Sequence, residues 1–281
     1  MEDRIKRLYE KQKYGRVKAM GYELAGVAFM AAIVSVFEGN PFTHKETVLF
    51  FEVNQPGWIM TSPYLFWFCA AVGIVAGIAG FSLGILREFS KFDRVLLQEC
   101  DSVKYLEMMA YLVTYGKSVE RKGFQKSILL IGEQRYVAAL IANDELEQAE
   151  AYVMHEWEGK RTKRLYRQAL TNIELEKKYE TKDADGYVYT LENAEKVFQT
   201  NKLFIAKKLI LKNDYRQALD VLEKRKEKVL YYEVARQFLM GVCYYQTGEA
   251  ERGKACMEYV RIHGNTLHCK KEAEEYLEMS K

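Results

Sequence analysis

Apolar side chains are concentrated in two stretches within the first third of the chain, and the second stretch is the longer. Residues 64–86 read YLFWFCAAVGIVAGIAGFSLGIL and contain no charged residue over 23 positions. A helix of this length is roughly 34 Å long, whereas the hydrocarbon core of a bilayer is about 30 Å thick. Tyr64, Phe66 and Trp67 lie at one end, where aromatic rings favour the membrane interface. The pattern predicts a transmembrane helix over 64–86 and disfavours a buried core helix.

The first apolar stretch is weaker, since only residues 24–37 form an uncharged run. A basic segment followed by a short apolar run is also the pattern of a secretory signal peptide. Two features favour a transmembrane helix over 20–38 instead: the basic segment is long, and no small-x-small cleavage site follows the apolar run. The connection 39–63 contains Gly, Pro and Asn clusters that predict turns. Within it, VLFFEV (48–53) predicts a short strand or an interfacial segment.

Charges around these two helices predict their orientation. Residues 1–20 hold seven Lys and Arg against three acidic residues, and the connection 39–63 holds only Lys45. Basic residues return directly after the second helix, at Arg87, Lys91 and Arg94. Because basic flanks stay on the cytosolic side, we expect a protein of the cell membrane with both termini in the cytosol and the connection outside.

The N-terminal segment 1–19 has a pattern of its own. Ile5, Leu8 and Tyr9 have helical spacing among basic residues. Two interpretations are open at this point. The segment is either an amphipathic helix that lies on the anionic inner leaflet or a solvated basic tail in the cytosol.

Glycines four residues apart mark the second predicted transmembrane helix. They form two small-xxx-small pairs, which let a neighbouring helix approach closely. The first predicted helix is the preferred neighbour, because it offers small side chains of its own. Homo-oligomerisation through the same glycines is the alternative. The two pairs are Gly73 with Gly77 and Gly80 with Gly84.

From about residue 95 onward, the apolar residues follow a helical period. Val103, Leu106 and Val113 form one stripe, which ends near Gly116. All three prolines lie between residues 41 and 63, so no proline interrupts the helices that follow. Short turns separate these helices, and neighbours must therefore pack as antiparallel hairpins. Further helices are predicted over 118–142, 145–157, 161–180, 189–199, 201–212, 215–228, 231–247, 250–262 and 267–279.

The segment 234–267 resembles a tetratricopeptide repeat. Its large, glycine and small residues occupy the positions that the repeat pattern requires, although Gln237 replaces the usual Trp and Asn265 the usual Pro. Small residues at these positions let the two helices of one hairpin approach closely. The residues that carry the resemblance are Met240, Gly241, Tyr244, Gly248, Gly253, Met257 and Val260.

The repeat pattern recurs earlier in the chain. Its small position falls at Gly253, at Ala218 and at Ala149, which are 35 and 69 residues apart in turn. The apolar segments and the resemblance together predict an all-α fold: two transmembrane helices in 20–94 from the former, then a cytosolic repeat domain over 95–281 that ends in a capping helix from the latter. An unrelated antiparallel helical bundle is the alternative.

Resemblance to tetratricopeptide proteins also implies a concave groove that binds a cytosolic protein or peptide. Mapping by repeat position places residues from the first helices of two adjacent repeats on that groove. Some of them are equally consistent with core positions, since an aromatic stripe at helical spacing often faces a core. The predicted groove residues are Lys207, Leu211, Phe238, Val242, Tyr245 and Gln246.

Charge and chemistry narrow the function classes. The formal net charge is +3, which is too small to indicate a nucleic-acid partner. Five cysteines at irregular spacings indicate reduced thiols rather than a disulfide framework. A glycine-rich stretch nearly spells a phosphate-binding loop, but Ala255 stands where Ser or Thr would hold Mg²⁺. The His and Cys residues between 256 and 269 match no zinc-finger spacing. We therefore expect no enzyme activity, no cofactor and no metal.

Two functional hypotheses remain. The preferred one is a membrane-anchored interaction module or scaffold whose repeat domain binds a cytosolic protein or peptide. The alternative is an accessory subunit of a membrane transporter or complex that acts through the transmembrane hairpin, motivated by Glu23 and by the glycine-rich second helix. The low proline content and the abundance of Lys and Tyr favour a bacterial source.

Overall fold

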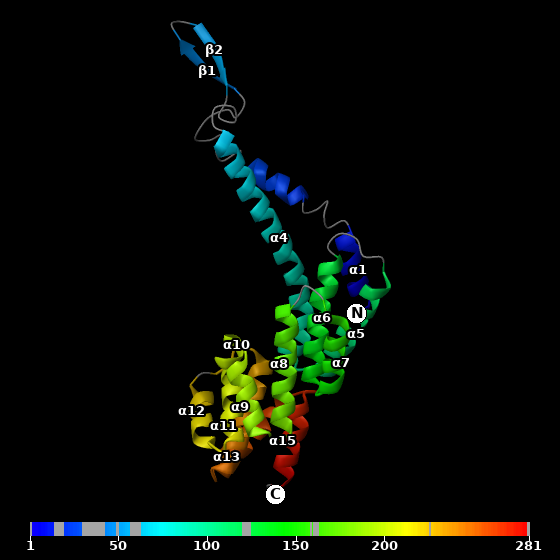
Figure 1. Cartoon of the computed structure of the whole chain (residues 1–281), viewed down its shortest axis with the longest axis vertical. Coiled ribbons are helices and arrows are strands. Elements are labelled where there is room, and N and C mark those ends of the chain that lie inside the picture. Colours follow the sequence, from blue (N-terminus) through cyan, green and yellow to red (C-terminus); the bar gives the residue numbers. More distant parts are fainter. Residues whose placement is uncertain are drawn as a thin grey trace. The chain divides into compact units, whose positions relative to one another are not determined.

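The computed structural model of the chain forms two compact units (Figure 1). The N-terminal unit comprises residues 1–90 and 115–129, and the C-terminal unit comprises residues 91–114 and 130–281. Each unit is described by itself. The structure describes residues 2–13, 20–29, 43–48, 51–56, 63–119, 125–157, 159, 163–224 and 226–279.

Helices dominate the described chain, as the sequence predicts. Residues 20–29 are helical in addition to the labelled helices. The labelled helices are α1 (Glu2–Lys13), α4 (Pro63–Leu97), α5 (Ser102–Ser118), α6 (Gln125–Ala142), α7 (Leu146–Trp157), α8 (Lys163–Glu180), α9 (Ala184–Asn193), α10 (Lys196–Gln199), α11 (Lys202–Leu211), α12 (Tyr215–Glu223), α13 (Leu230–Gln246), α14 (Ala250–His263) and α15 (His268–Met279).

One strand pair interrupts the all-α pattern. β1 (Thr43–Val48) and β2 (Phe51–Pro56) form an antiparallel hairpin in which Val48 pairs with Phe51. VLFFEV therefore does not form one strand, because its first residue ends β1 and its last three begin β2. Of the two interpretations of 48–53, the single strand was wrong, since Val48 and Phe51 pair across a hairpin, and the interfacial segment stays a prediction.

The apolar face of α1 packs against protein. Ile5 and Tyr9 are 0% and 1% exposed. The Tyr9 ring meets the Tyr115 ring edge-on at 5.5 Å, and the Gln125 side-chain amide donates a hydrogen bond of 2.9 Å to the Tyr9 carbonyl oxygen. A Cβ at Gly116 would lie 1.9 Å from Oη of Tyr9, so only glycine fits beneath this ring. The expectation that these apolar residues lie on the inner leaflet or in solvent was therefore wrong.

α4 is a single helix of 35 residues that runs well past the predicted end at residue 86. Pro63 stands at its first position, where a missing N–H costs nothing. Its surface exposes large apolar side chains, among them Phe68, Val75 and Leu83, and the helix over 20–29 does the same at Leu24. Across the residues that the structure describes, however, we find no helix with both the length and the apolar character needed to cross a membrane.

The helices from α8 to α15 stack in sequence order. Each packs against the next, and α11 also packs against α13, as α13 does against α15. Within the α13–α14 hairpin a Cβ at Gly241 would lie 2.8 Å from Cε of Met257, and one at Gly253 would lie 3.0 Å from the Tyr245 ring. Both glycines thus permit the close helix approach that the sequence predicts. The observed stacking is consistent with a helical repeat.

The helix boundaries between residues 183 and 199 depart from the prediction. The DADG sequence over 183–186 starts a helix instead of a turn, because the side chain of Asp183 accepts a hydrogen bond of 2.9 Å from the backbone N–H of Gly186 and caps α9. α9 then ends at Asn193, and the chain is extended at Glu195 before the short α10. The helix predicted over 189–199 is therefore broken in the middle.

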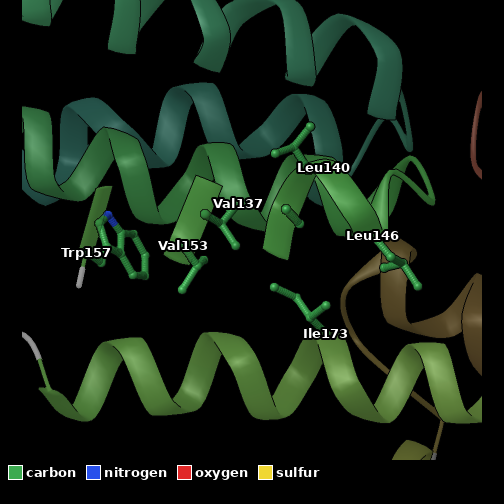
Figure 2. Close-up of a cluster of buried hydrophobic side chains, with 7 residues drawn as sticks. Val137, Leu140, Leu146, Val153, Trp157 and Ile173 are labelled. Carbon is green, nitrogen blue, oxygen red and sulfur yellow. The ribbon is translucent and has the colours of Figure 1, made fainter. Parts of the chain in front are cut away.

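An apolar core joins α6, α7 and α8 (Figure 2). Trp157 closes one end of it, and Ile173 of α8 faces side chains of α6 and α7. Burial of such side chains stabilises the fold by roughly 25 cal/mol per Å² of apolar surface. The cluster comprises Val137, Leu140, Leu146, Ala149, Val153, Trp157 and Ile173.

Candidate functional site

Lys207, one of the predicted groove residues, lies in a polar cluster between helices of the C-terminal unit. Its ammonium forms an ion pair with the carboxylate of Glu176 on α8 and lies 4.8 Å from the centroid of the Tyr179 ring. The side chains of Lys207 and Glu176 are only 18% and 22% exposed, so solvent screens their attraction less than at an open surface. Lys207 is therefore already neutralised within the chain.

The last helix contributes to the same cluster. Burial raises the pKa of Tyr179, and the charges of Glu272 on α15 and of Glu176 raise it further. Burial also raises the pKa of the Cys269 thiol to about 12. Both groups stay protonated at neutral pH, so they offer neither a phenolate nor a thiolate as a nucleophile. We name Glu176, Tyr179, Lys207, Cys269 and Glu272 the central cluster.

The other predicted groove residues lie in different surroundings. Tyr245 stacks on Tyr276 of α15, with ring centroids 5.6 Å apart and an interplanar angle of 14°. Phe238 is 7% exposed and belongs to the core, and Val242 is half-buried. Leu211 packs against the core cluster of Leu175, Tyr187 and Leu191.

Gln246 is exposed and lies at the end of α13. It lines a polar depression of about 420 Å³ together with Asp214, in the turn between α11 and α12, and Arg216, in the first turn of α12.

The six predicted residues thus lie in different places. Lys207 belongs to the central cluster, Tyr245 packs on α15, and Gln246 lines the polar depression. Phe238, Val242 and Leu211 are buried or half-buried among apolar side chains. That these residues form a partner-binding groove stays a prediction.

A set of contacts that the sequence did not reveal joins the beginning and the end of the C-terminal unit. Thr266, in the turn before α15, donates its backbone N–H to the Cys100 carbonyl oxygen at 3.3 Å and its hydroxyl to a carboxylate oxygen of Asp101 at 3.2 Å. In return, its carbonyl oxygen accepts a hydrogen bond of 2.9 Å from the Ser102 hydroxyl. The side-chain amide of Asn265 donates to the Glu99 carbonyl oxygen at 2.9 Å.

A histidine–carboxylate contact lies beside these hydrogen bonds. Nε2 of His268 lies 3.6 Å from a carboxylate oxygen of Asp144 and 3.3 Å from one of Glu272. Asp144 stands in the turn between α6 and α7, with a positive φ of 64°. We name the contact between His268 and Asp144 and the hydrogen bonds of Asn265 and Thr266 the closing contacts.

A second depression, of about 240 Å³, lies between α6 and α8. Its lining combines apolar side chains such as Val137 and Leu165 with the amides of Gln168 and Asn172. Trp157 also lines it, and the buried Nε1 of this residue has no hydrogen-bond partner among the described residues.

The predicted membrane glycines lie on α4. A Cβ at Gly84 would meet no atom within 4 Å, so no described helix packs closely there. The surroundings of Gly73, Gly77 and Gly80 lie outside the described residues.

Among the residues that the structure describes, no group of three or more His, Cys, Asp or Glu side chains is arranged to hold a metal ion. Comparison of the chain with protein-family models, with curated proteins and with solved structures finds no match. The fold by itself defines the class: a predominantly helical protein whose C-terminal unit is consistent with a helical repeat.

Proposed function

We propose that this chain is a membrane-anchored protein-interaction module whose tetratricopeptide-like C-terminal unit binds a cytosolic protein or peptide. The observation that carries the proposal is the ordered stack of antiparallel helices, in which α11 contacts α13 and α13 contacts α15. Stacks of this kind present extended surfaces that suit protein binding. No enzyme activity is part of the proposal.

The sequence supports the membrane anchor. Residues 64–86 form an uncharged run of 23 positions, and in the structure they belong to α4. Lys and Arg are frequent in residues 1–19, before the first apolar stretch, and Arg87 follows directly after the second stretch. We propose that 20–38 and 64–86 form a transmembrane hairpin with both termini in the cytosol.

Lys207 and Tyr245 are the predicted groove residues that test binding most sharply. Lys207→Glu places a second carboxylate beside Glu176, and Tyr245→Ala removes the ring that stacks on Tyr276. We expect the double variant to lose its partner in crosslinking from native membranes while far-UV circular dichroism stays unchanged. Full partner recovery by this variant would contradict the assignment.

A matched control stands next to Lys207 in the same helix. Lys208 makes an ion pair of 2.8 Å with Glu192, a residue that is 62% exposed. The variant Lys208→Glu thus reverses the same charge and breaks a comparable ion pair on another face of α11. We expect it to keep the partner.

The alternative is an accessory subunit of a membrane complex that acts through the hairpin. The large apolar side chains that α4 exposes, such as Phe68, Val75 and Leu83, favour it, because they are suited to contact with lipid or with another membrane helix. Replacing 20–94 with an unrelated anchor distinguishes the two functions. The interaction module survives the replacement, and the accessory subunit does not.

A further inference from the structure

The depression between α6 and α8 combines apolar walls with uncharged polar groups. Ile141, Leu165 and Phe198 are among the apolar side chains that line it. Its polar groups are side-chain amides, and none of the described residues that line it carries a charge. A phosphate or a carboxylate would lose its hydration there without meeting an opposite charge, so the depression suits an uncharged occupant. We name this depression the α6–α8 hollow.

The amides of the hollow indicate which uncharged group it can bind. Gln168 is held in place, because its Nε2 donates a hydrogen bond of 2.7 Å to Glu195, which also accepts one of 3.1 Å from Nε of Arg164. No hydrogen bond joins the side chain of Gln134 or of Asn172 to another described residue. A side-chain amide both donates and accepts hydrogen bonds. These two amides therefore match a peptide group, which also does both.

The size of the hollow limits what enters it. Its volume of about 240 Å³ is below the roughly 300–1,000 Å³ of pockets for drug-sized ligands, so it suits one large side chain. Val137 and Trp157 form part of its wall and also belong to the core cluster of α6, α7 and α8 (Figure 2). Each is only 3% exposed. The wall is therefore rigid before anything binds, which lowers the cost of binding.

We propose that the α6–α8 hollow receives one large apolar side chain, such as leucine, from an extended segment of a partner protein, and that Gln134 and Asn172 bind the adjoining peptide groups. The segment is extended because a helix uses its own N–H and C=O groups internally. In such recognition, backbone hydrogen bonds give affinity and the pocket selects the side chain. The proposal rests on the proposed interaction function and adds a place on α6 and α8 to the predicted residues on α11 and α13.

Binding of short blocked peptides to the full-length protein in detergent tests the hollow. Replacing Trp58 and Trp67, which do not line the hollow, by Phe leaves Trp157 as the sole tryptophan and its fluorescence as the reporter. The probes are acetyl-Gly-Leu-Gly-amide, the same peptide with alanine in place of leucine, and 3-methylbutan-1-ol, which has an apolar group but no peptide group. We expect the leucine peptide to change the emission saturably. Both other probes should bind at least about tenfold more weakly.

Equal affinities of the leucine and alanine peptides would overturn the apolar pocket, and equal affinities of the leucine peptide and the alcohol would overturn the role of the amides. Absence of any saturable change with the leucine peptide would overturn the whole proposal.

Variants of the hollow sharpen the test in the same single-tryptophan background. Ala138 is exposed and lines the hollow, so Ala138→Phe should fill it and abolish binding of the leucine peptide. The matched control is Ala151→Phe, at an exposed position of α7 that does not line the hollow, and it should bind normally. The double variant Gln134→Leu with Asn172→Leu should bind the peptide about tenfold more weakly and the alcohol as before. Far-UV circular dichroism confirms that each variant keeps its helices. Binding by Ala138→Phe equal to that of the control would overturn the proposal.

Partner capture separates the hollow from the proposed function. In crosslinking from native membranes, the partner recovered by the unmodified chain should be lost by Ala138→Phe and kept by Ala151→Phe. Recovery of the same partner by both variants would contradict docking in the hollow and leave the interaction function standing. Absence of any partner on the unmodified chain, together with selective binding of the leucine peptide, would contradict the interaction function and leave the selectivity of the hollow established.

Discussion

Arg236 is expected to be the most sensitive charged residue of the stack. Its guanidinium donates to both carboxylate oxygens of Glu233, at 2.9 and 2.7 Å, and to the Leu222 carbonyl oxygen at 2.9 Å. The two side chains are 9% and 2% exposed. The variant Arg236→Met leaves the Glu233 carboxylate buried without its cation and also leaves a carbonyl group of α12 without a donor.

The size of the effect follows from burial. Removal of one member of a buried ion pair costs about 3–5 kcal/mol. Glu233 keeps hydrogen bonds of 2.8 Å from the Glu227 backbone and from the Gln237 amide, so the lower end, about 3 kcal/mol, is expected. For a unit of this size, such a loss lowers the melting temperature by about 6–12 °C.

Urea unfolding of the detergent-solubilised protein, followed by circular dichroism, measures this change. The matched control is Arg252→Met, since Arg252 also pairs with two glutamates but is 58% exposed. It should destabilise the protein far less than Arg236→Met, since solvent screens an exposed ion pair. The double variant Glu233→Gln with Arg236→Met should recover part of the loss. If Arg236→Met is no more destabilising than the control, the reasoning from burial is refuted.

Three further predictions use thermal or urea unfolding. Gly116→Ala, which drives a methyl group into the Tyr9 ring, should lower the free energy of unfolding by about 1–3 kcal/mol. Gly84→Ala, with open space around it, should not lower this free energy. Equal effects of the two variants would contradict the close approach of Gly116 and Tyr9. Asp183→Ala should lower the melting temperature through loss of the α9 cap, and an unchanged melting temperature would refute the cap. Burial opposes ionisation of Glu233, but its hydrogen bonds prevail and lower its pKa. Its stabilising effect is therefore present above the ordinary glutamate pKa and is lost as the pH falls. The difference in free energy of unfolding between wild type and Glu233→Gln should narrow from about pH 7 to about pH 3. A difference that widens toward acid would contradict this sign.

Helix positions in the last two thirds of the chain could be predicted because apolar spacing and turn residues agree there. The predicted helices over 145–157 and 250–262 match α7 and α14 to within one residue. The start of α9 at Ala184 was missed because Asp183 and Gly186 are typical of turns and of helix N-termini alike. Local sequence cannot distinguish these two uses of the same residues.

The candidate site could be predicted only in part, since it depends on contacts between distant segments. Lys207 was assigned to an open groove, but its partner Glu176 lies 31 positions earlier, and no local pattern links the two. Thr266 carries the closing contacts without any distinctive sequence signal. Glu233 and Arg236, three residues apart, read as an ordinary solvated pair until burial is known.

The central claim is that the C-terminal unit is the docking platform of a membrane-anchored module. Crosslinking-assisted co-purification of the full-length chain from its native membrane, beside a chain that lacks residues 95–281, tests it most directly. We predict a partner that the full-length chain recovers and the shortened chain loses. Partners retained on residues 1–94 alone would contradict the claim and assign the function to the membrane hairpin.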